Sequence, residues 1–398
     1  MTALSPVAPR ERVLTLDVLR GFALLGVLIA NLFWLYSARQ FEHPSEPHTV
    51  DRIATALESL LVQGKAQTLL TFLFGFGFAV QLLRAQARNE PVMGLYVRRL
   101  LVLLTIGSLH VMLWWGDVTW HYGLTGFGLL LFLRASNRTR VAWAAFLIFV
   151  PGIVLWGIPA LRDHLFDRQT FEQHVKPFLA TLHGKSFFAV VPAHVRFAWA
   201  YLAPSIWSYF PWLVGQFLLG YIAGTQRWFD DEGVHHLRLF RRMLGYGLIC
   251  AVGNAAVAIR IHLGPRGAHE LSVAANLAIA ALAQVGTLGL TAAYVSGVVL
   301  LMQRRSWRRL LSLIAPVGRM PLTTYISQSL VCTFLFYGWG LGWAGQVSAA
   351  RCIGLALLIF AAQVLACHAW LRRFRFGPLE WVWRTLVYLR RQPMRATG

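Results

Sequence analysis

Long apolar runs separated by short polar segments fill the chain from residue 16 to residue 371. Several of these runs approach the roughly 20 apolar residues that a helix needs to cross a bilayer. A transmembrane β-strand would instead show short segments of alternating apolar and polar residues. The pattern predicts about ten membrane-spanning helices, at residues 16–37, 66–83, 100–116, 118–134, 141–160, 205–225, 243–262, 275–301, 319–339 and 350–371.

The composition agrees with this pattern. Of the 398 residues, 57% are hydrophobic and only 13% are charged, whereas a soluble domain carries roughly 25% charged residues. The chain is therefore too apolar to form one large soluble core. The predicted fold class is an all-α, polytopic transmembrane helical bundle.

The positive charge follows the predicted topology. A net charge of +21 could indicate nucleic-acid binding, but the basic residues lie between the apolar runs, as in membrane proteins. If the N-terminus is cytoplasmic, the inside segments hold 26 of the 37 Lys and Arg residues. Ten spans with both termini in the cytoplasm give this alternation, and one span more or fewer would destroy it. We therefore expect no nucleic-acid partner.

The same topology divides the chain into three parts. Residues 1–15 form a cytoplasmic N-terminal segment, residues 16–371 a single transmembrane domain, and residues 372–398 a basic cytoplasmic tail. The first apolar run is too long for the core of a cleavable signal peptide. Residues 161–204 form a long external loop with partly amphipathic segments, which we expect on the outer membrane face. Loops of this length are often functional, for example as lids.

Polar side chains are concentrated between Gly107 and Gly126. His110 lies about ten residues into the third apolar run, where an ionisable group is costly and indicates a functional site. Its neutral ring could serve as a general base, or it could simply form a hydrogen bond to a neighbouring helix. Asp117 lies about 10 Å further along a straight helix, so contact with His110 requires that the turn at Gly116 fold it back.

The aromatic residues of this stretch have a simpler explanation. Trp114, Trp115 and Trp120 are typical of an aromatic belt at the outer membrane interface. The same explanation covers His121 and Tyr122 in part. On this interpretation only His110 lies deep enough to need another account.

The first apolar run carries a second group of polar residues. Thr15 can cap a helix there, and Asp17 suits its positive N-terminal end. Arg20, one turn inside, either reaches back to the interface or forms an anion site for a phosphate or pyrophosphate. Asn31 follows three turns later on the same face and needs a partner.

Late in the chain, Tyr325 and Gln328 fall inside the ninth run, where Gln328 is the least expected residue. The four cysteines lie in apolar runs and form no CxxC pair, so no metal site is expected. No polar cluster elsewhere in the sequence changes that expectation.

Five segments of the chain resemble the YeiB family of bacterial inner-membrane proteins of unknown function. They are LDVLRGFALLGVLIANL, LLTFLFGFGFAVQL, RRLLVLLTIGSLHVMLWWGDVTWHYGLTG, GRMPLTTYISQSLVCTFLFYGWGLGW and FRFGPLEWVWRTLVY. The resemblance extends over nearly the whole chain and implies a location in the bacterial inner (cytoplasmic) membrane. The LDVLRG start also resembles heparan-α-glucosaminide N-acetyltransferases and membrane acyltransferases that O-acylate surface polysaccharides. Asn31 stands where the polysaccharide acyltransferases carry a histidine, and is similar to the N-acetyltransferase branch.

This wider resemblance implies a membrane-embedded acyltransferase that moves an acyl group from cytoplasmic acyl-CoA to an external glycan or lipid acceptor. We assign catalytic roles to His110, Asn31 and Asp117, with His110 as general base or transient acyl carrier. Arg20 and Asp17 would bind the CoA phosphates. The hypothesis predicts that Arg20, Asn31, His110 and Gln328 converge on one cavity open to the cytoplasm. The substrate-binding residues would be Gln328, Tyr325, Tyr122 and His121.

Two other hypotheses remain open. The same polar residues could line the path of a transporter or permease for a small metabolite or lipid intermediate. The protein could also be a non-catalytic envelope membrane protein, in which case His110, Arg20 and Asn31 can be replaced without a phenotype.

Overall fold

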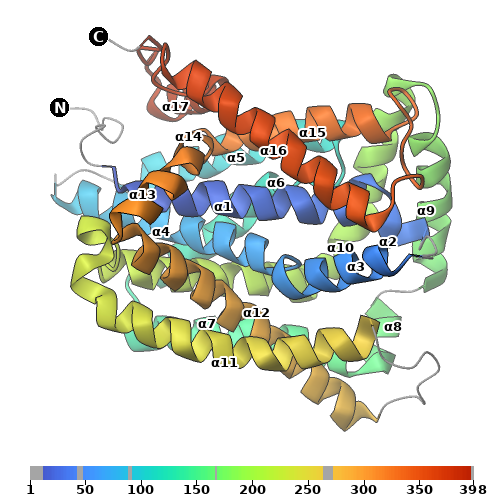
Figure 1. Ribbon diagram of the computed structural model, residues 1–398, viewed down its shortest axis with the longest axis horizontal. Helices are drawn as coiled ribbons and strands as arrows, with labels where there is room; N and C mark the ends of the chain where they lie inside the picture. Colours follow the sequence, from blue (N-terminus) through green and yellow to red (C-terminus); the bar gives the residue numbers. More distant parts are fainter. Residues whose placement is uncertain (1–11, 43–47, 88–91, 166–167, 263–271, 396–398) are drawn as a thin grey trace.

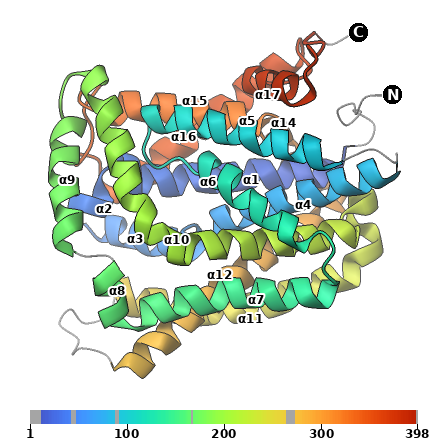
Figure 2. The ribbon, with the colours of Figure 1, turned by 180° about the vertical axis from the view of Figure 1, so that it is seen from behind.

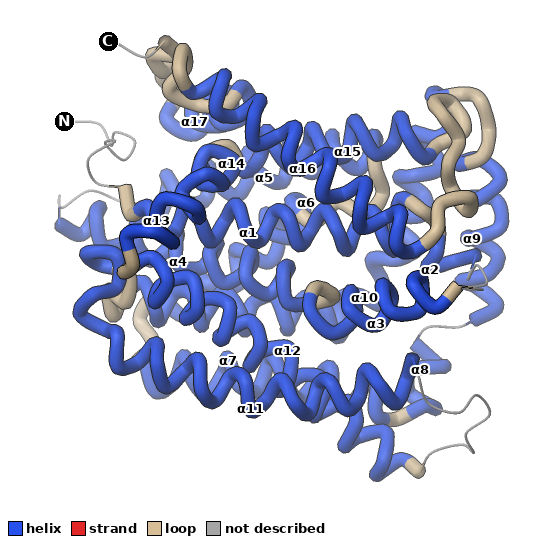
Figure 3. Tube along the Cα trace, in the orientation of Figure 1, coloured by secondary structure: helices blue, strands red, loops and turns tan. Residues whose placement is uncertain are grey.

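A bundle of helices accounts for the residues that the computed structural model describes, which are 12–42, 48–87, 92–165, 168–262 and 272–395 (Figures 1 and 3). Within these ranges there is no β-strand, and only Phe374 and Arg395 form an isolated bridge. The long helices are α1 (Leu14–Ala30), α3 (Thr49–Leu61), α4 (Lys65–Ala87), α5 (Val92–Leu113), α7 (Asn137–Gly157), α9 (Arg168–Leu182), α10 (Phe187–Thr225), α11 (Leu237–His262), α12 (Val273–Met302), α15 (Pro321–Phe336), α16 (Ala349–Leu371) and α17 (Pro378–Tyr388).

Shorter helical elements connect the long ones. A π-helix, η2, continues α1, and α6 with the 3₁₀-helix η3 follows α5. The short elements are η2 (Asn31–Tyr36), α2 (Arg39–Glu42), α6 (Thr119–Thr125), η3 (Gly126–Phe132), α8 (Pro159–Leu165), η4 (Asp230–His236), α13 (Arg305–Leu311), η5 (Ser312–Ile314) and α14 (Ala315–Arg319).

Six helical segments of the described chain are long and apolar enough to cross a membrane. Each of these segments contains or overlaps one of the ten predicted spans. By length and composition, the chain is therefore an all-helical membrane protein. The other four predicted spans are not confirmed as such. The six segments are Leu14–Tyr36, Thr49–Ala87, Met93–Leu113, Asn137–Gly157, Val273–Met302 and Ala349–Leu371.

The predicted span at 118–134 is not one continuous α-helix. It consists of the seven-residue α6 and the seven-residue η3, which meet at Gly126. The region predicted as the external loop 161–204 is also different in character, because it contains α8, α9 and the first part of α10. Figures 1 and 2 show α9 running across the ends of the long helices.

Helix α13, with three arginines among its seven residues, lies at one end of the bundle. The start of α1, together with α13, α14 and α17, lies at the left end in Figure 1, and α2 and α9 lie at the right end. The arginines of α13 therefore lie at the end of the bundle opposite α2 and α9. The site described below lies along the second half of α1.

Helix α1 runs through the middle of the bundle and contacts α4, α14, α15 and α16. Its first turn is capped across space, since Glu232 accepts hydrogen bonds from the backbone nitrogens of Leu14 (2.9 Å) and Thr15 (2.8 Å). The predicted role of Thr15 as the cap is wrong, because the helix begins one residue earlier and the Thr15 hydroxyl also donates to Glu232 (2.5 Å).

Glycines on α4 and α10 allow the two helices to pack closely. A side chain at Gly75 on α4 would collide with the backbone of Phe217 on α10. The facing Gly220 on α10 would collide with the backbone of Phe72 in the same way. Backbones that approach this closely fix α4 against α10, which holds Gln67 and Tyr209 opposite one another.

Candidate functional site

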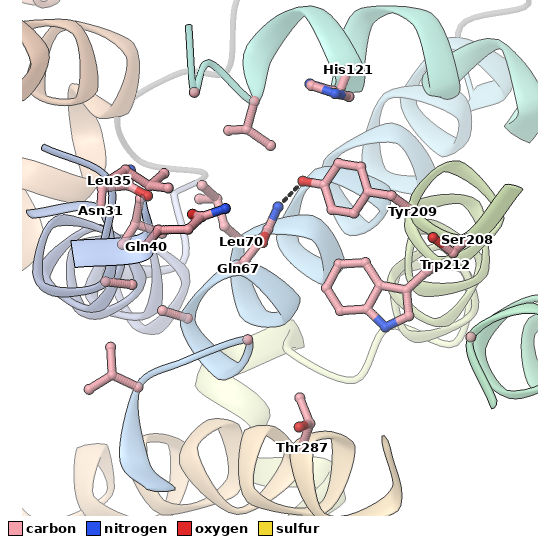
Figure 4. A pocket seen from close by; sticks show the side chains of 18 of the residues that line it. Asn31, Leu35, Gln40, Gln67, Leu70, His121, Ser208, Tyr209, Trp212 and Thr287 are labelled. Carbon is pink, nitrogen blue, oxygen red and sulfur yellow. Dashed lines mark hydrogen bonds between the residues drawn. The ribbon is translucent and has the colours of Figure 1, made fainter. Parts of the chain in front are cut away.

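A cavity of about 680 Å³ lies among the helices beside the second half of α1. Its wall comes from α1, η2 and α2, from α4 and the α3–α4 connection, from the α5–α6 connection and α6, and from α7, α10, α12 and α15. Figure 4 shows side chains from several of these elements around one space. The polar side chains on the wall are Asn31, Gln40, Gln67, Asp117, His121, Tyr122, Ser208, Tyr209, Gln284, Thr287 and Tyr325.

The connection between α5 and α6 folds Asp117 back against α5. His110 Nδ1 lies 2.7 Å from Asp117 Oδ1, and both side chains are buried. The carboxylate also accepts hydrogen bonds from the Thr119 hydroxyl (2.7 Å) and the Trp120 backbone nitrogen (3.0 Å). The turn therefore brings together the two residues that a straight helix would hold about 10 Å apart.

His110 is sealed within the protein and does not line the cavity. Because Asp117 accepts at Nδ1, the hydrogen is on that nitrogen and Nε2 carries the lone pair. Nε2 is buried and has no hydrogen-bond partner. The rings of Trp114 and Tyr325 lie 6.2 and 5.4 Å away between centroids. A substrate in the cavity therefore does not meet Nε2 in this arrangement.

His121, unlike His110, lies on the cavity wall. Its Nδ1 lies 3.0 Å from the backbone oxygen of Asp117, which can only accept. The hydrogen is therefore on Nδ1, and Nε2 is an unprotonated nitrogen with no hydrogen-bond partner among the described residues. The ring lines the cavity (Figure 4) and is held by the rings of Trp120 at 3.9 Å and Tyr209 at 5.2 Å.

Amide and hydroxyl groups face His121 across the cavity. Gln67 Nε2 donates a hydrogen bond to the Tyr209 hydroxyl, drawn as a dashed line in Figure 4. Asn31, the first residue of the π-helix η2, is also on this wall and makes no hydrogen bond through its side chain to another described residue. Single π turns inside α-helices are frequent at functional sites.

Two tyrosines close the wall next to Asp117. The Tyr122 hydroxyl lies 2.7 Å from the Thr71 hydroxyl on α4. The Tyr325 hydroxyl accepts a hydrogen bond of 3.2 Å from the Val118 backbone nitrogen. Both residues line the cavity, but both hydroxyls already have protein partners, and their assignment to substrate binding stays a prediction.

The remaining predicted residues lie elsewhere. Arg20 pairs with Asp17 at 2.9 Å, and eleven residues of helix, about 16 Å of rise, separate Arg20 from Asn31. Gln328 donates to the Gln363 side chain on α16 at 3.0 Å. Neither Arg20 nor Gln328 lines the cavity, so the four residues expected to converge there do not.

Trp114 does not belong to an aromatic belt. It is fully buried and stacks on Tyr36 at 4.5 Å between centroids. Sequence position alone placed it at the end of an apolar run, where an interfacial tryptophan is also common. The turn at Gly116 instead directs it into the protein.

Sequence reasoning began a span at residue 66 but missed helix α3 before it, and with it the break between α3 and α4 inside the structure. Gly64 has a φ of +78°, a conformation that glycine adopts without strain, and it places Gln67 on the cavity wall. Next to the break, the Trp34 indole donates to Glu58 at 2.7 Å, and Lys65 donates to the Ser59 backbone oxygen at 2.7 Å. Two buried charged residues inside a predominantly apolar stretch were the available signal.

Within the described ranges, no three His, Cys, Asp or Glu side chains are grouped so as to hold a metal ion. The cavity wall instead offers amides, hydroxyls and one imidazole nitrogen, because the Asp117 carboxylate is already held by His110, Thr119 and Trp120. Such a set suits an uncharged or carbonyl-containing group better than a cation.

Comparisons with known proteins place the chain among others of unknown function. Residues 223–390 match the family model described as "Protein of unknown function (DUF418)". The chain is 31% identical to "Uncharacterized protein YxaH" of Bacillus subtilis over 99% of this chain and 98% of the relative. It is 29% identical to "Uncharacterized protein YeiB" of Escherichia coli, over 98% of each. No solved structure gives a significant match.

Proposed function

This chain belongs to the YeiB family of proteins of unknown function, and from that premise we propose that it is a membrane-embedded acyltransferase. The acyl donor is cytoplasmic acyl-CoA, and the acceptor is a hydroxyl or amino group of a glycan or lipid on the outer side. The protein lies in the inner membrane of a bacterial cell, with both termini in the cytoplasm.

One observation carries the proposal. His121 presents an unprotonated Nε2 to a cavity of about 680 Å³ and has its other nitrogen fixed by the Asp117 carbonyl. A histidine held at one nitrogen and accessible at the other is the arrangement of a general base. His110, the sequence-based candidate, has the same tautomer but no access to the cavity. The catalytic role therefore passes from His110 to His121.

The step balances with His121 as the only proton carrier. Nε2 takes the proton of the acceptor hydroxyl while that oxygen attacks the thioester carbonyl carbon. The resulting tetrahedral intermediate collapses with cleavage of the carbon–sulfur bond, and the thiolate takes the proton from Nε2. An ester and a free CoA thiol leave, and His121 returns to its starting state.

The amides opposite His121 suit the second requirement of acyl transfer. Negative charge develops on the carbonyl oxygen in the transition state, and donors fixed in advance stabilise it. Asn31 offers two amide hydrogens, and Gln67 offers the hydrogen that it does not give to Tyr209. Both residues lie on the cavity wall with His121.

Asp117 and His110 act as positioning residues. The Asp117 backbone holds His121, and its carboxylate is held by His110, Thr119 and Trp120. This network fixes the turn from which α6 starts. The pair thereby orients the His121 ring without contacting the substrate.

The donor reaches the cavity from the basic end of α1. Arg20, whose side chain is 28% exposed and paired with Asp17, binds a phosphate of CoA there. About 16 Å of helix rise separates Arg20 from Asn31, a distance that an extended pantetheine arm spans. This placement leaves the thioester, and not the nucleotide, beside His121.

The test uses membrane vesicles from cells that express the chain, supplied with acetyl-CoA labelled in the acetyl group. We expect label in vesicle-bound lipid or glycan above that of vesicles without the chain, and loss of this excess in His121→Ala. Phe188→Ala, at a ring that is 85% exposed, is the control variant and keeps it. Wild-type vesicles that retain no excess label contradict the proposal.

Transport is the second candidate function, favoured by the break between α3 and α4. Discontinuous helices at a central cavity are typical of secondary transporters, and Gly64 and Gln67 place this break on the cavity wall. A transporter predicts that proteoliposomes move a labelled metabolite without any acyl donor. Acyl transfer predicts that retained label depends on the donor.

A further inference from the structure

Five buried hydrogen-bond donors without partners gather at the basic end of the protein. They belong to α5, α14 and α17, and the one unpartnered acceptor on these helices among the described residues, His110 Nε2, lies eleven residues beyond Arg99, about 16 Å further along α5. Each buried donor without a partner costs free energy, so an acceptor is expected to complete the site. The atoms are Arg99 Nε, Arg319 Nε, Trp383 Nε1, Arg384 Nε and Thr385 Oγ1.

Direct contacts bring α5 and α17 together. The Arg99 guanidinium lies 5.2 Å from the centre of the Trp383 ring. One residue earlier, Arg98 donates to the Val387 backbone oxygen at 3.0 Å. These two contacts place Arg384, between Trp383 and Val387, against the same part of α5.

Contacts of α14 and α15 add the third element. A side chain at Gly318 would collide with the Asp17 backbone, so Arg319 follows a point where α14 touches α1. A side chain at Gly377, which precedes α17, would meet Met320 at 3.0 Å. Arg319 therefore lies between α1 and the start of α17, and Figure 2 shows α5, α14 and α17 near the beginning of α1.

The charges at this end are not balanced. Arg12 interacts electrostatically with Arg20 and Arg319, and Arg384 with Arg12 and Arg99. The two carboxylates that act on them are already engaged, Asp17 with Arg20 and Glu380 with the start of α15.

Two arginines at this end, Arg12 and Arg384, have lowered pKa values. Burial, and then the neighbouring arginines Arg12 and Arg99, lower the pKa of Arg384 to about 10, while Tyr388 and Glu380 oppose the shift. Burial likewise lowers the pKa of Arg12, against the effect of Asp17. A bound anion would offset both the burial of these guanidinium groups and the smaller repulsion between neighbouring arginines.

We propose that Arg99, Arg319 and Arg384 bind a phosphate or pyrophosphate group between α5, α14 and α17. Guanidinium groups match phosphate oxygens in geometry and charge, and the Trp383 indole next to Arg99 offers a further donor. The group belongs either to a soluble phosphate ester or to an anionic lipid headgroup. The site stands on these contacts alone and does not require that the protein transfer acyl groups.

The experiment uses the purified full chain in nanodiscs and two probes. In the first arm, inorganic pyrophosphate is titrated into nanodiscs of phosphatidylcholine, and the thermal unfolding midpoint is followed. In the second arm, no pyrophosphate is added. Native mass spectrometry counts the phosphatidylglycerol molecules that stay bound to the protein. The variants are Arg99→Gln with Arg384→Gln, and the control is Arg305→Gln with Arg309→Gln on the exposed helix α13.

A response in either arm supports the site, and the arm that responds identifies the source. We expect the double variant to bind at least about tenfold more weakly, as the loss of charge-assisted hydrogen bonds predicts, while the control binds like the wild type. Arg319→Gln, on a separate helix, gives the same loss if the double variant does not fold. No response from the wild type, or an equal loss in the control, overturns the proposal.

Discussion

The end of α5 and the start of α6 each present a histidine to Asp117, and the two histidines differ in what they can reach. His110 is held by the carboxylate and its free nitrogen is buried. His121 is held by the backbone oxygen of the same residue and its free nitrogen faces the cavity. Depth in the membrane favoured His110, but access to a cavity decides which ring can meet a substrate.

The difference also separates stability from chemistry. Around His110 the contacts with Asp117, Trp114 and Tyr325 join α5 to the turn that follows it and to α15. Around His121 the contacts hold one ring in place and leave one nitrogen to the cavity. Substitutions at the first histidine are therefore expected to weaken the fold, and those at the second to weaken the reaction.

Asp117→Ala is expected to have the largest effect, because it removes the residue that both histidines share. The variant leaves the His110 ring, the Thr119 hydroxyl and the Trp120 nitrogen without their acceptor. Breaking a buried polar pair of this kind costs about 3–5 kcal/mol. Thermal unfolding in detergent measures the loss. Asp163→Ala, at an exposed surface pair, should change stability by less than about 0.5 kcal/mol, and an equal effect of both would refute the role of Asp117.

Gly107→Ala should have the next largest effect, because it pushes apart α5, which carries His110, and α6, which carries His121. A side chain at Gly107 on α5 would collide with the backbone of Trp120 on α6, and overpacking of this kind costs about 1–3 kcal/mol. We expect lower stability and slower transfer together, as α6 carries His121 away from its position. Gly94→Ala on the same helix meets nothing within 4 Å and should be neutral or stabilising. Comparable behaviour of the two variants would show that α5 and α6 are not tightly packed.

Tyr209→Phe should have the smallest effect. It removes the hydroxyl that accepts from Gln67 but keeps the ring beside His121. We expect a stability loss of about 1 kcal/mol and a transfer rate reduced by no more than about tenfold, since the base stays in place. Parallel rate and unfolding measurements check this. A rate loss as large as that of His121→Ala would mean that the hydroxyl, and not the imidazole, takes the proton.

Much of the architecture followed from local pattern. Apolar run lengths located six helical segments that can cross a membrane. The tight connection at Gly116 and Asp117 was also predicted. These features depend on residues that are close in the sequence, so spacing was enough to find them.

The candidate site is formed by contacts that the spacing of residues along the sequence does not predict. Asp117 meets His110 only because the chain reverses, and Gln67 meets Tyr209 across 142 positions. The caps of two helices are equally distant, with Glu232 at the start of α1 and Glu380 at the start of α15. Composition correctly marked Gly107 to Gly126 as unusual, but only packing could show which histidine faces the cavity.

The most direct measurement compares acyl transfer from labelled acetyl-CoA by His121→Ala and His110→Gln, each corrected for the amount of folded protein. Loss of a general base lowers a rate by about 10²–10⁴-fold. We predict a loss of this size for His121→Ala, partly restored by added imidazole, and a loss of less than about tenfold for His110→Gln. A His121→Ala variant that transfers at the wild-type rate, beside an inactive His110→Gln variant, would contradict the assignment.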